Sequence, residues 1–242
     1  MLDHSQLLSG LCPQDSGLLL AKMTKVRLES GRILSQPGEM VDFCYFPCGS
    51  ALVASSVVLS SGEVVETRIV GREGAVGATA SRCHLPTYTR SQVIHGGCFY
   101  RIAWSELHHA NMRSSAISVL LSCYADYLLA QVSQSIACNT AHSIEQRAAK
   151  WLLATVERMG GCDIQMTQEQ LATMIGVGRS YTSRVVQSFK VEGLLHTRRG
   201  GLAITDQAGL QRRSCSCGNQ LRLHYDAVFA NLYGHAYGRL PQ

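Results

Sequence analysis

The sequence predicts an α+β protein made of a β-rich roll, a long helix, and a helical unit that ends in a hairpin. Three observations support this prediction. Glycines divide residues 24–102 into short runs of β-prone residues. Apolar residues then recur at helical spacing from residue 104 to about 137. Residues 166–205 have the pattern of two short helices, a glycine turn between them, and a basic hairpin.

The N-terminal region begins with residues 3–22, which we expect to be helical with an interruption at Pro13. Many short strands separated by turn residues are typical of a small barrel or roll. We expect six strands, at Lys25–Leu28, Asp42–Phe46, Leu52–Leu59, Glu63–Val70, Gln92–Ile94 and Cys98–Ile102.

The long helix is predicted from an apolar stripe with intervals mostly of three and four residues, and it should run to about Ala137. Such a stripe packs either on the roll or against the same stripe of a second chain. Its members are Ile117, Leu120, Leu121, Tyr124, Leu128 and Val132.

The C-terminal unit opens with a helix that should begin at Thr167, because Thr167 and Gln170 have the spacing of a capping box. Apolar residues Leu171, Met174 and Ile175 mark its buried face. Gly176-Val177-Gly178 then ends it, since glycine tolerates the backbone angles of a tight turn.

A second helix should span Arg179–Glu192 and be followed by the basic hairpin His196–Gly201. Helix, glycine turn, helix and basic hairpin in this order indicate a winged helix-turn-helix, a unit that places its second helix in the major groove of DNA. Its inward residues should be Thr182, Val185, Val186 and Phe189, and its outward residues Arg179, Ser180, Ser183, Arg184 and Gln187, which include no acid.

Charge is distributed in agreement with a DNA-binding C-terminus. Residues 1–139 carry ten basic and ten acidic side chains, whereas residues 140–242 carry twelve and seven, so the whole net charge of +5 lies in the second part. A local positive surplus attracts polyanions. We therefore expect double-stranded DNA as a partner. Two recognition helices about one DNA turn apart require a dimer, so we expect the stripe of the long helix to pair with its own copy.

Composition excludes several other classes. No uninterrupted apolar run approaches the roughly 18 residues of a membrane span, and no secretory signal opens the chain. The ten irregularly spaced cysteines favour reduced thiols and a cytoplasmic location over a disulfide framework. The glycine-rich segment at 71–77 lacks the spacing of a nucleotide-binding loop, and no serine lies in a nucleophile elbow. We expect no enzymatic activity, no cofactor and no metal.

Particular motifs resemble those of the CRP/FNR superfamily of bacterial transcription regulators, and the resemblance covers nearly the whole chain. It implies a cyclic-nucleotide-binding-like β-roll (1–103), a dimerisation helix (104–138) and a winged helix-turn-helix domain (139–242), with RNA polymerase as a further partner. The matching runs are Pro37-Gly38-Glu39, Tyr45-Phe46-Pro47, Val70 to Gly74, Ala137-Cys138-Asn139, His142 to Arg147, Trp151-Leu152-Leu153, and Gly176 to Arg179 followed by Arg184. The middle runs look like a subgroup without an assigned ligand.

The resemblance also implies roles for individual residues. Arg179, Ser180 and Arg184 match positions that read bases, and Thr167 matches one that touches phosphate. The family usually has glutamate in place of Ser180, so its half-site cannot be transferred to this chain. It usually has a capping serine at Gly178, where glycine costs only a few tenths of a kcal/mol. The remaining predicted phosphate contacts are Tyr181, Ser183, Arg198 and Arg199.

The resemblance also offers candidate ligand residues in the roll. Cyclic-nucleotide-binding members hold the phosphate with an Arg-Ser pair and the ribose with a glutamate, and Arg90, Ser91 and Glu73 are the corresponding candidates. About seven extra residues separate Glu73 from Arg90, so we expect no response to cyclic AMP. Two alternatives stay open: the roll binds another small ligand, or it binds none. In the second case Arg90 would pair with an acidic residue on the surface of the roll.

The cysteines offer an alternative sensor. Cys138 and His142 should share a helical face, and Cys215 and Cys217 follow nearer the C-terminus. Three thiols and a histidine are an acceptable tetrahedral set for zinc. The spacing matches no known finger, so we favour a small buried Cys138 and a surface pair at 215 and 217. A redox- or metal-sensing regulator and a non-specific DNA-binding protein remain the alternatives.

Overall fold

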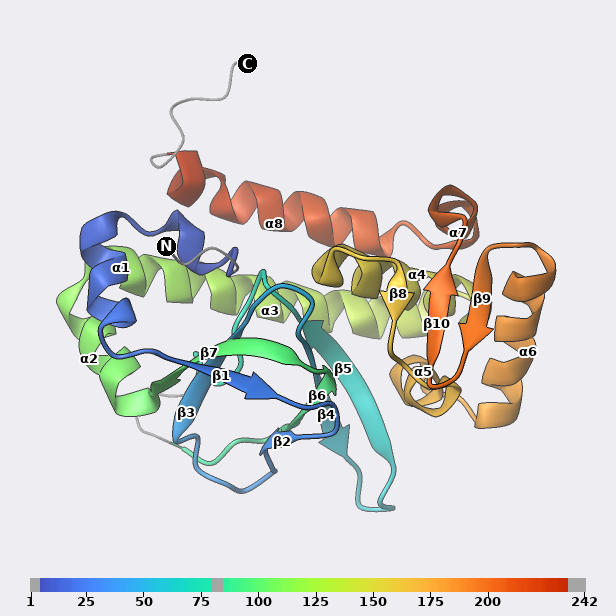
Figure 1. Ribbon diagram of the computed structural model, residues 1–242, viewed down its shortest axis with the longest axis horizontal. Coiled ribbons are helices and arrows are strands. Elements are labelled where there is room, and N and C mark those ends of the chain that lie inside the picture. The colour runs from blue at the N-terminus through green and yellow to red at the C-terminus, as the bar shows by residue number, and fades with distance from the viewer. Residues whose placement is uncertain (1–4, 80–84, 235–242) are drawn as a thin grey trace.

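The computed structural model describes residues 5–79 and 85–234, and its fold is α+β as predicted (Figure 1). A β-roll lies beside a long helix, and a second group of helices with a small sheet lies at the far end of that helix (Figure 1). The last helix runs back along the long helix, so the C-terminal segment contacts both halves.

The roll consists of two antiparallel sheets, with strand orders β1-β7-β3 and β2-β6-β4-β5. All six predicted strands of the roll are confirmed, within one or two residues at most ends, and β2 is a further strand of the roll that was not predicted. The two sheets of the roll enclose a core that includes Val53, Val93 and Phe99, each fully buried. The strands are β1 (Thr24–Leu28), β2 (Ile33–Ser35), β3 (Phe43–Pro47), β4 (Leu52–Val58), β5 (Val64–Val70), β6 (Arg90–His95) and β7 (Gly97–Ala103).

Short helices flank the roll. The N-terminal segment forms a 3-10 turn, η1 (Leu8–Gly10), and helix α1 (Pro13–Leu20). Pro13 is the first residue of α1, where its missing N–H costs nothing. After β7, helix α2 (Trp104–Arg113) ends at Ser114, whose hydroxyl caps the next helix by accepting a hydrogen bond from the Ile117 N–H at 3.1 Å.

The long helix α3 (Ser115–Ala141) packs its predicted apolar stripe inside the chain. Ile117, Leu120 and Tyr124 are almost completely buried in a cluster that also holds roll residues and residues of the last helix. The Tyr124 hydroxyl donates to the Ala75 carbonyl at 2.8 Å and accepts from the Ala75 N–H at 2.9 Å. The roll and α8 bury Ile117, Leu120, Tyr124 and Leu128, so these four residues of the predicted stripe are not available to a second chain, whereas Leu121 and Val132 are half-buried.

Helix α3 is also the one helix among residues 5–79 and 85–234 whose length and composition would allow it to cross a membrane. The search for long uninterrupted apolar runs did not find α3, because polar residues interrupt its apolar ones. A core helix meets the same criteria, and the contacts of α3 with the roll and with α8 account for its buried apolar residues.

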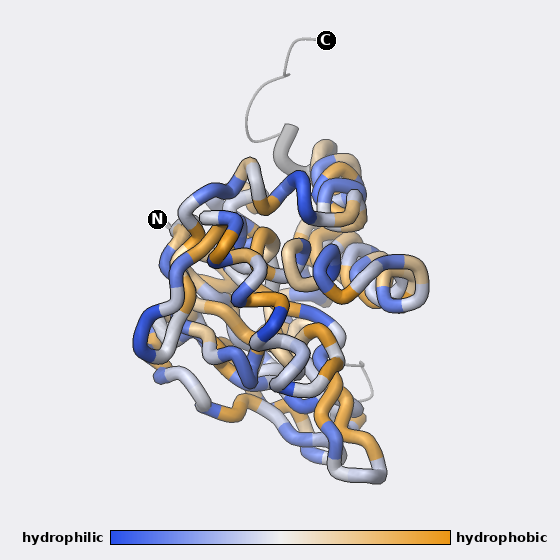
Figure 2. The backbone as a smooth tube through the Cα atoms, turned by 90° about the vertical axis from the view of Figure 1, so that its right-hand side faces the viewer, coloured by the Kyte–Doolittle hydropathy of each residue, from blue (hydrophilic) through white to orange (hydrophobic). Residues whose placement is uncertain are grey.

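The C-terminal group contains helices α4 (Ile144–Met159), α5 (Gln168–Ile175), α6 (Arg179–Val191) and α7 (Gln207–Arg213) around a sheet of order β8-β10-β9. Its strands are β8 (Asp163–Ile164), β9 (Leu195–Arg198) and β10 (Gly201–Ile204), and helix α8 (Cys217–Gly234) follows. Hydrophobic and hydrophilic residues alternate along the helices at this end (Figure 2), and their apolar sides, including Leu171, Val186 and Phe189, form one buried core.

Candidate nucleic-acid interface

The helix-turn-helix forms as the sequence predicts. Thr167 caps α5 through a capping box, in which its hydroxyl accepts from the Gln170 N–H at 3.1 Å and its own N–H donates to the Gln170 side chain at 2.8 Å. Gly176 ends α5 with a left-handed φ of 66°. Gly178 stands at the N-cap of α6 and supplies no side-chain cap, so the turn sets the start of α6 through backbone geometry.

Helix α6 has the two faces that were predicted. The inward residues Thr182, Val185, Val186 and Phe189 are buried. On the opposite side, Arg179, Ser180, Arg184 and Gln187 are exposed, and Ser183 is half-buried. The outward set holds two guanidinium groups and no carboxylate, so it can donate hydrogen bonds to phosphates and to acceptor atoms on base edges.

Two outward side chains, Ser183 and Arg184, and the neighbouring Tyr181 already have partners within the domain. The Tyr181 hydroxyl donates to Glu145 at 3.2 Å, and the Ser183 hydroxyl donates to the Gln168 side chain at 2.6 Å. The Arg184 guanidinium lies 4.7 Å from the centre of the Tyr181 ring. The contacts orient Arg184 before any nucleic acid binds, whereas Tyr181 and Ser183 would have to exchange or share their partners to reach a phosphate.

The wing is the hairpin of β9 and β10, with a tight turn at Gly200, whose φ is 75°. Arg199 is exposed at this turn. Arg198 forms an ion pair with Asp163 at 2.8 Å, in which both side chains are more than half exposed. An ion pair this exposed contributes little free energy, so Arg198 remains available to a stronger anion.

Two arginines beside the recognition helix were not singled out by the sequence analysis. Arg212 and Arg213 on α7 line a groove of about 670 Å³ together with Tyr181 and Arg184. They pair with Asp206 at 3.7 Å and with Glu192 at 3.4 Å, and both pairs are substantially exposed. Their position at the end of a helix packed on α4 gave no sequence signal beyond their charge.

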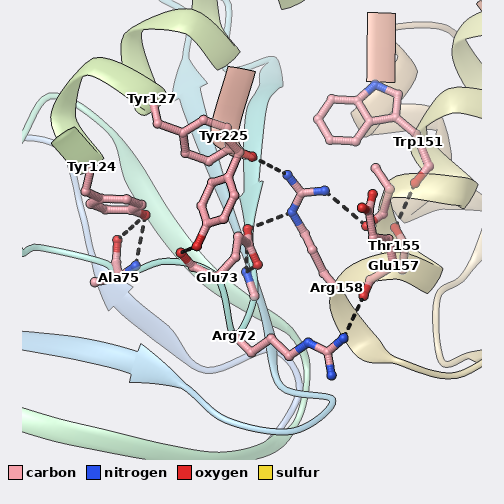
Figure 3. A network of polar contacts seen from close by, with 12 residues as sticks. Arg72, Glu73, Ala75, Tyr124, Tyr127, Trp151, Thr155, Glu157, Arg158 and Tyr225 are labelled. Carbon is pink, nitrogen blue, oxygen red and sulfur yellow. Dashed lines mark hydrogen bonds and ion pairs between the residues drawn. The ribbon is translucent and has the colours of Figure 1, made fainter. Parts of the chain in front are cut away.

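Glu73, the candidate ribose ligand, is engaged by the C-terminal half of the chain instead (Figure 3). Its carboxylate forms an ion pair with Arg158 of α4 at 2.8 Å, and each side chain is only 11% exposed. The Arg158 guanidinium also donates to the Tyr127 hydroxyl at 3.2 Å, and the Tyr225 hydroxyl donates to the Glu73 carbonyl at 3.4 Å. Burial alone would lower the pKa of Arg158, but Glu73, Tyr127 and Glu157 together outweigh the effect of burial and raise that pKa.

The Arg-Ser pair lies elsewhere, on β6. The Ser91 hydroxyl lies 3.5 Å from that of Ser55 and borders a cavity of about 340 Å³ that Glu73 does not line. In the sheet, Ser56 of β4 pairs with Glu66 of β5 on one side and with Arg90 of β6 on the other. Burial raises the pKa of Glu66 to about 7, and the Arg90 charge opposes this rise. Residues 80–84 of the altered loop lie outside the described residues.

The four cysteine and histidine residues come together in space. Cys138, Cys215 and Cys217 are buried and form a separate cluster, so the interpretation of the 215/217 pair as a surface feature is wrong. Packing of α8 along α3 removes both thiols from solvent. His142 shares the face of Cys138 as predicted, since the helix continues through residue 139 and the His142 N–H bonds to the Cys138 carbonyl.

The fold and the exposed face of α6 define a class of protein, in which a cyclic-nucleotide-binding-like roll is joined by a long helix to a winged helix-turn-helix. Residues 146–213 match the family model of the Crp-like helix-turn-helix domain. Residues 146–213 therefore form a Crp-like helix-turn-helix domain, and the whole chain has the fold of CRP/FNR-type regulators of known structure.

Solved structures support this assignment at the level of the fold. The chain is similar to FixK2 from Bradyrhizobium japonicum, with a TM-score of 0.68 and 14% identity over 80% of this chain and 98% of that one. A putative CRP/FNR-family regulator from Eubacterium rectale gives 0.65 and 16%, over 88% and 98%. A CRP-family regulator from Thermus thermophilus gives 0.63 and 18%, over 78% and 96%. No curated protein sequence matches this chain.

Proposed function

We propose that the chain is a sequence-specific DNA-binding transcription regulator that acts as a homodimer without cyclic AMP, and that RNA polymerase is a further partner. The observation that supports this function best is the exposed face of α6, which carries arginine, serine and glutamine side chains, holds no carboxylate, and lies beside a basic wing. Such a helix fits the major groove of B-form DNA.

The proposal assigns different tasks to the two kinds of residue. Arg179, Ser180 and Arg184 are exposed near the start of α6, where the recognition helix of a helix-turn-helix contacts base edges. The phosphate contacts would come from the start of α5, from α6 itself and from the wing, and they would fix the position of α6 on the DNA. They are Thr167, Tyr181, Ser183, Arg198 and Arg199.

The dimer seam is proposed on the face of α3 opposite the buried stripe. Val119, Leu129 and Ile136 are each about half to two-thirds exposed, although they are large apolar residues. These three residues are ten and seven apart in sequence, as positions of one heptad seam are. The other exposed positions of this face, residues 115, 122, 126, 133 and 140, are serine, aspartate or threonine. We expect a second copy of the chain to pack on this face, because a two-fold symmetric DNA site requires a dimer.

Independence of cyclic AMP is proposed because the three candidate ligand residues are not gathered around one cavity. Ser91 borders the cavity in the roll, whereas Glu73 is held by Arg158. A ribose would have to replace a buried ion pair to reach Glu73, and removing one partner of such a pair is costly.

Paired substitutions test the division of tasks, using a duplex selected from a random pool and single-base variants of it. Arg184→Ala should lose about 1–3 kcal/mol of binding free energy and lose discrimination at one base position. Arg199→Ala should weaken all sequences equally and reduce the salt slope by about 1. Fluorescence anisotropy at several salt concentrations measures both effects. Uniform loss for both variants would remove the base-reading role of Arg184.

A further inference from the structure

The cluster of Cys138, His142, Cys215 and Cys217 has the composition and geometry of a metal site. The four possible ligand atoms lie within 4.8 Å of one another. They come from two segments far apart in sequence, the C-terminal end of α3 and the segment that starts α8. We infer that these residues bind a thiophilic divalent ion of the zinc type as a Cys₃His site.

The distances between ligand atoms match a tetrahedral ion. Zinc–sulfur bonds of about 2.3 Å and zinc–nitrogen bonds of about 2.0–2.1 Å place tetrahedral ligand atoms about 3.8 Å (sulfur to sulfur) and about 3.6 Å (sulfur to nitrogen) apart. The Cys138 and Cys215 sulfurs are 3.7 Å apart. The Cys217 sulfur is 3.6 Å from His142 Nδ1. Two opposite edges of the tetrahedron are therefore already formed.

The chemistry of the ligands selects the ion. Three sulfurs and an imidazole favour zinc and other soft or borderline metals over magnesium or calcium, which need oxygen ligands. All four positions of the tetrahedron come from protein, so the site is of the structural kind, with no open position for catalysis. Binding releases the three thiol protons to solvent and leaves a site with one net negative charge.

Neighbouring groups fit that negative charge. Cys217 is the first residue of α8, the end of a helix whose dipole is favourable to a bound negative charge. The Gln134 side-chain amide donates to the Cys217 sulfur at 3.0 Å, as an outer-shell donor does around a metal thiolate.

The site lies at the junction between the long helix and the C-terminal domain. His142 occupies the turn between α3 and α4, and Cys138 precedes it by one helical turn. A metal would fix this turn to the start of α8 and so limit the angle between α3 and the domain that carries α6. This consequence rests on the proposed function, and it predicts that metal changes DNA affinity by about fivefold or more.

Cobalt binding tests the site independently of DNA. Reduced, metal-free, full-length protein is titrated with Co²⁺ and the absorption spectrum is recorded. We expect one ion per chain, the intense visible bands of tetrahedral cobalt, a thiolate-to-cobalt charge-transfer band, and displacement by Zn²⁺. Cys138→Ser and Cys215→Ser should lose these bands. Cys162→Ser, which removes an exposed thiol of the same domain, is the matched control.

Thiol protection in the unsubstituted protein covers the case in which a variant does not fold. Zn²⁺ should slow alkylation of Cys138, Cys215 and Cys217 but not of Cys162, as read by mass spectrometry. An absent cobalt spectrum with unprotected thiols would overturn the proposal. So would thiols that bind no metal and instead form a 138–215 disulfide on oxidation.

DNA binding is then measured with and without Zn²⁺. Cobalt bands together with an unchanged DNA affinity would overturn the coupling but leave the DNA-binding function standing. Cobalt bands in a protein that selects no DNA sequence would overturn the proposed function but not the metal site.

Discussion

The ion pair between Glu73 and Arg158 is predicted to hold the roll against the C-terminal half of the chain, and removing one side of it should destabilise the fold strongly. Both side chains are 11% exposed and the pair is 2.8 Å long. Arg158→Met leaves the Glu73 carboxylate buried without its cation. Loss of one partner of a buried pair costs about 3–5 kcal/mol. In a chain of this size that corresponds to a lower Tm of about 6–20 °C.

Urea unfolding in a double-mutant cycle measures this effect. Glu73→Gln and Arg158→Met should each destabilise, and the double variant should lose less than the sum of the two, by about 2 kcal/mol or more, because neither charge is then stranded. Lys22→Met serves as the control, since it removes an exposed pair with Glu106 at 3.3 Å. It should change stability by less than about 1 kcal/mol. Additive effects of the Glu73 and Arg158 substitutions would refute the buried pair as the link.

Three further predictions concern the dimer, a buried carboxyl and the turn. Leu129→Asp should give monomers in sedimentation while Leu223→Asp, an equally apolar exposed change on α8, should not; a dimer that survives Leu129→Asp would exclude the proposed seam. Burial raises the pKa of Glu66 from 4.5 to about 7, so the folded state holds the proton more tightly and stability should fall as pH rises between these values. Glu66→Gln should therefore stabilise the protein at pH 8 by about 1–3 kcal/mol and have little effect at pH 4, and equal urea midpoint shifts at both pH values would contradict this. Gly176→Ala should cost about 1–2 kcal/mol because of the left-handed φ of 66°, and a thermal midpoint at or above that of the parent protein would show that the turn tolerates alanine.

Local patterns explain why much of the fold could be predicted. The six strands are separated by glycines and turn residues, and the capping box at Thr167 fixes the start of α5 from four residues of sequence. β2 was missed because a strand of three residues shows no alternation long enough to recognise. An element whose bounds depend on neighbouring residues can therefore be predicted from the sequence.

Choices between alternative partners were harder to predict. The stripe of α3 that includes Ile117 was expected to pair with a second chain, because periodicity shows that a face is buried but not what buries it. α8 supplies part of the cover, and its approach to α3 is a tertiary contact between segments about 100 residues apart. The same packing brings Cys138 next to Cys215.

Glu73 illustrates the same limit at the site. Its position in the run Val70 to Gly74 matches a ligand-binding segment, yet its carboxylate faces Arg158, 85 residues later in the chain. The candidate DNA-binding residues were easier to locate, since exposure on α6 follows directly from helical periodicity.

The most direct test of the central claim is selection of bound duplexes from a random DNA pool by the purified full-length protein, with and without cyclic AMP. The account predicts enrichment of one two-fold symmetric site, with half-sites about one DNA turn apart, to the same degree in both selections. Enrichment only in the presence of the nucleotide would contradict independence of cyclic AMP. Failure to enrich any sequence, under metal-free and zinc-loaded conditions alike, would contradict the claim that α6 reads DNA.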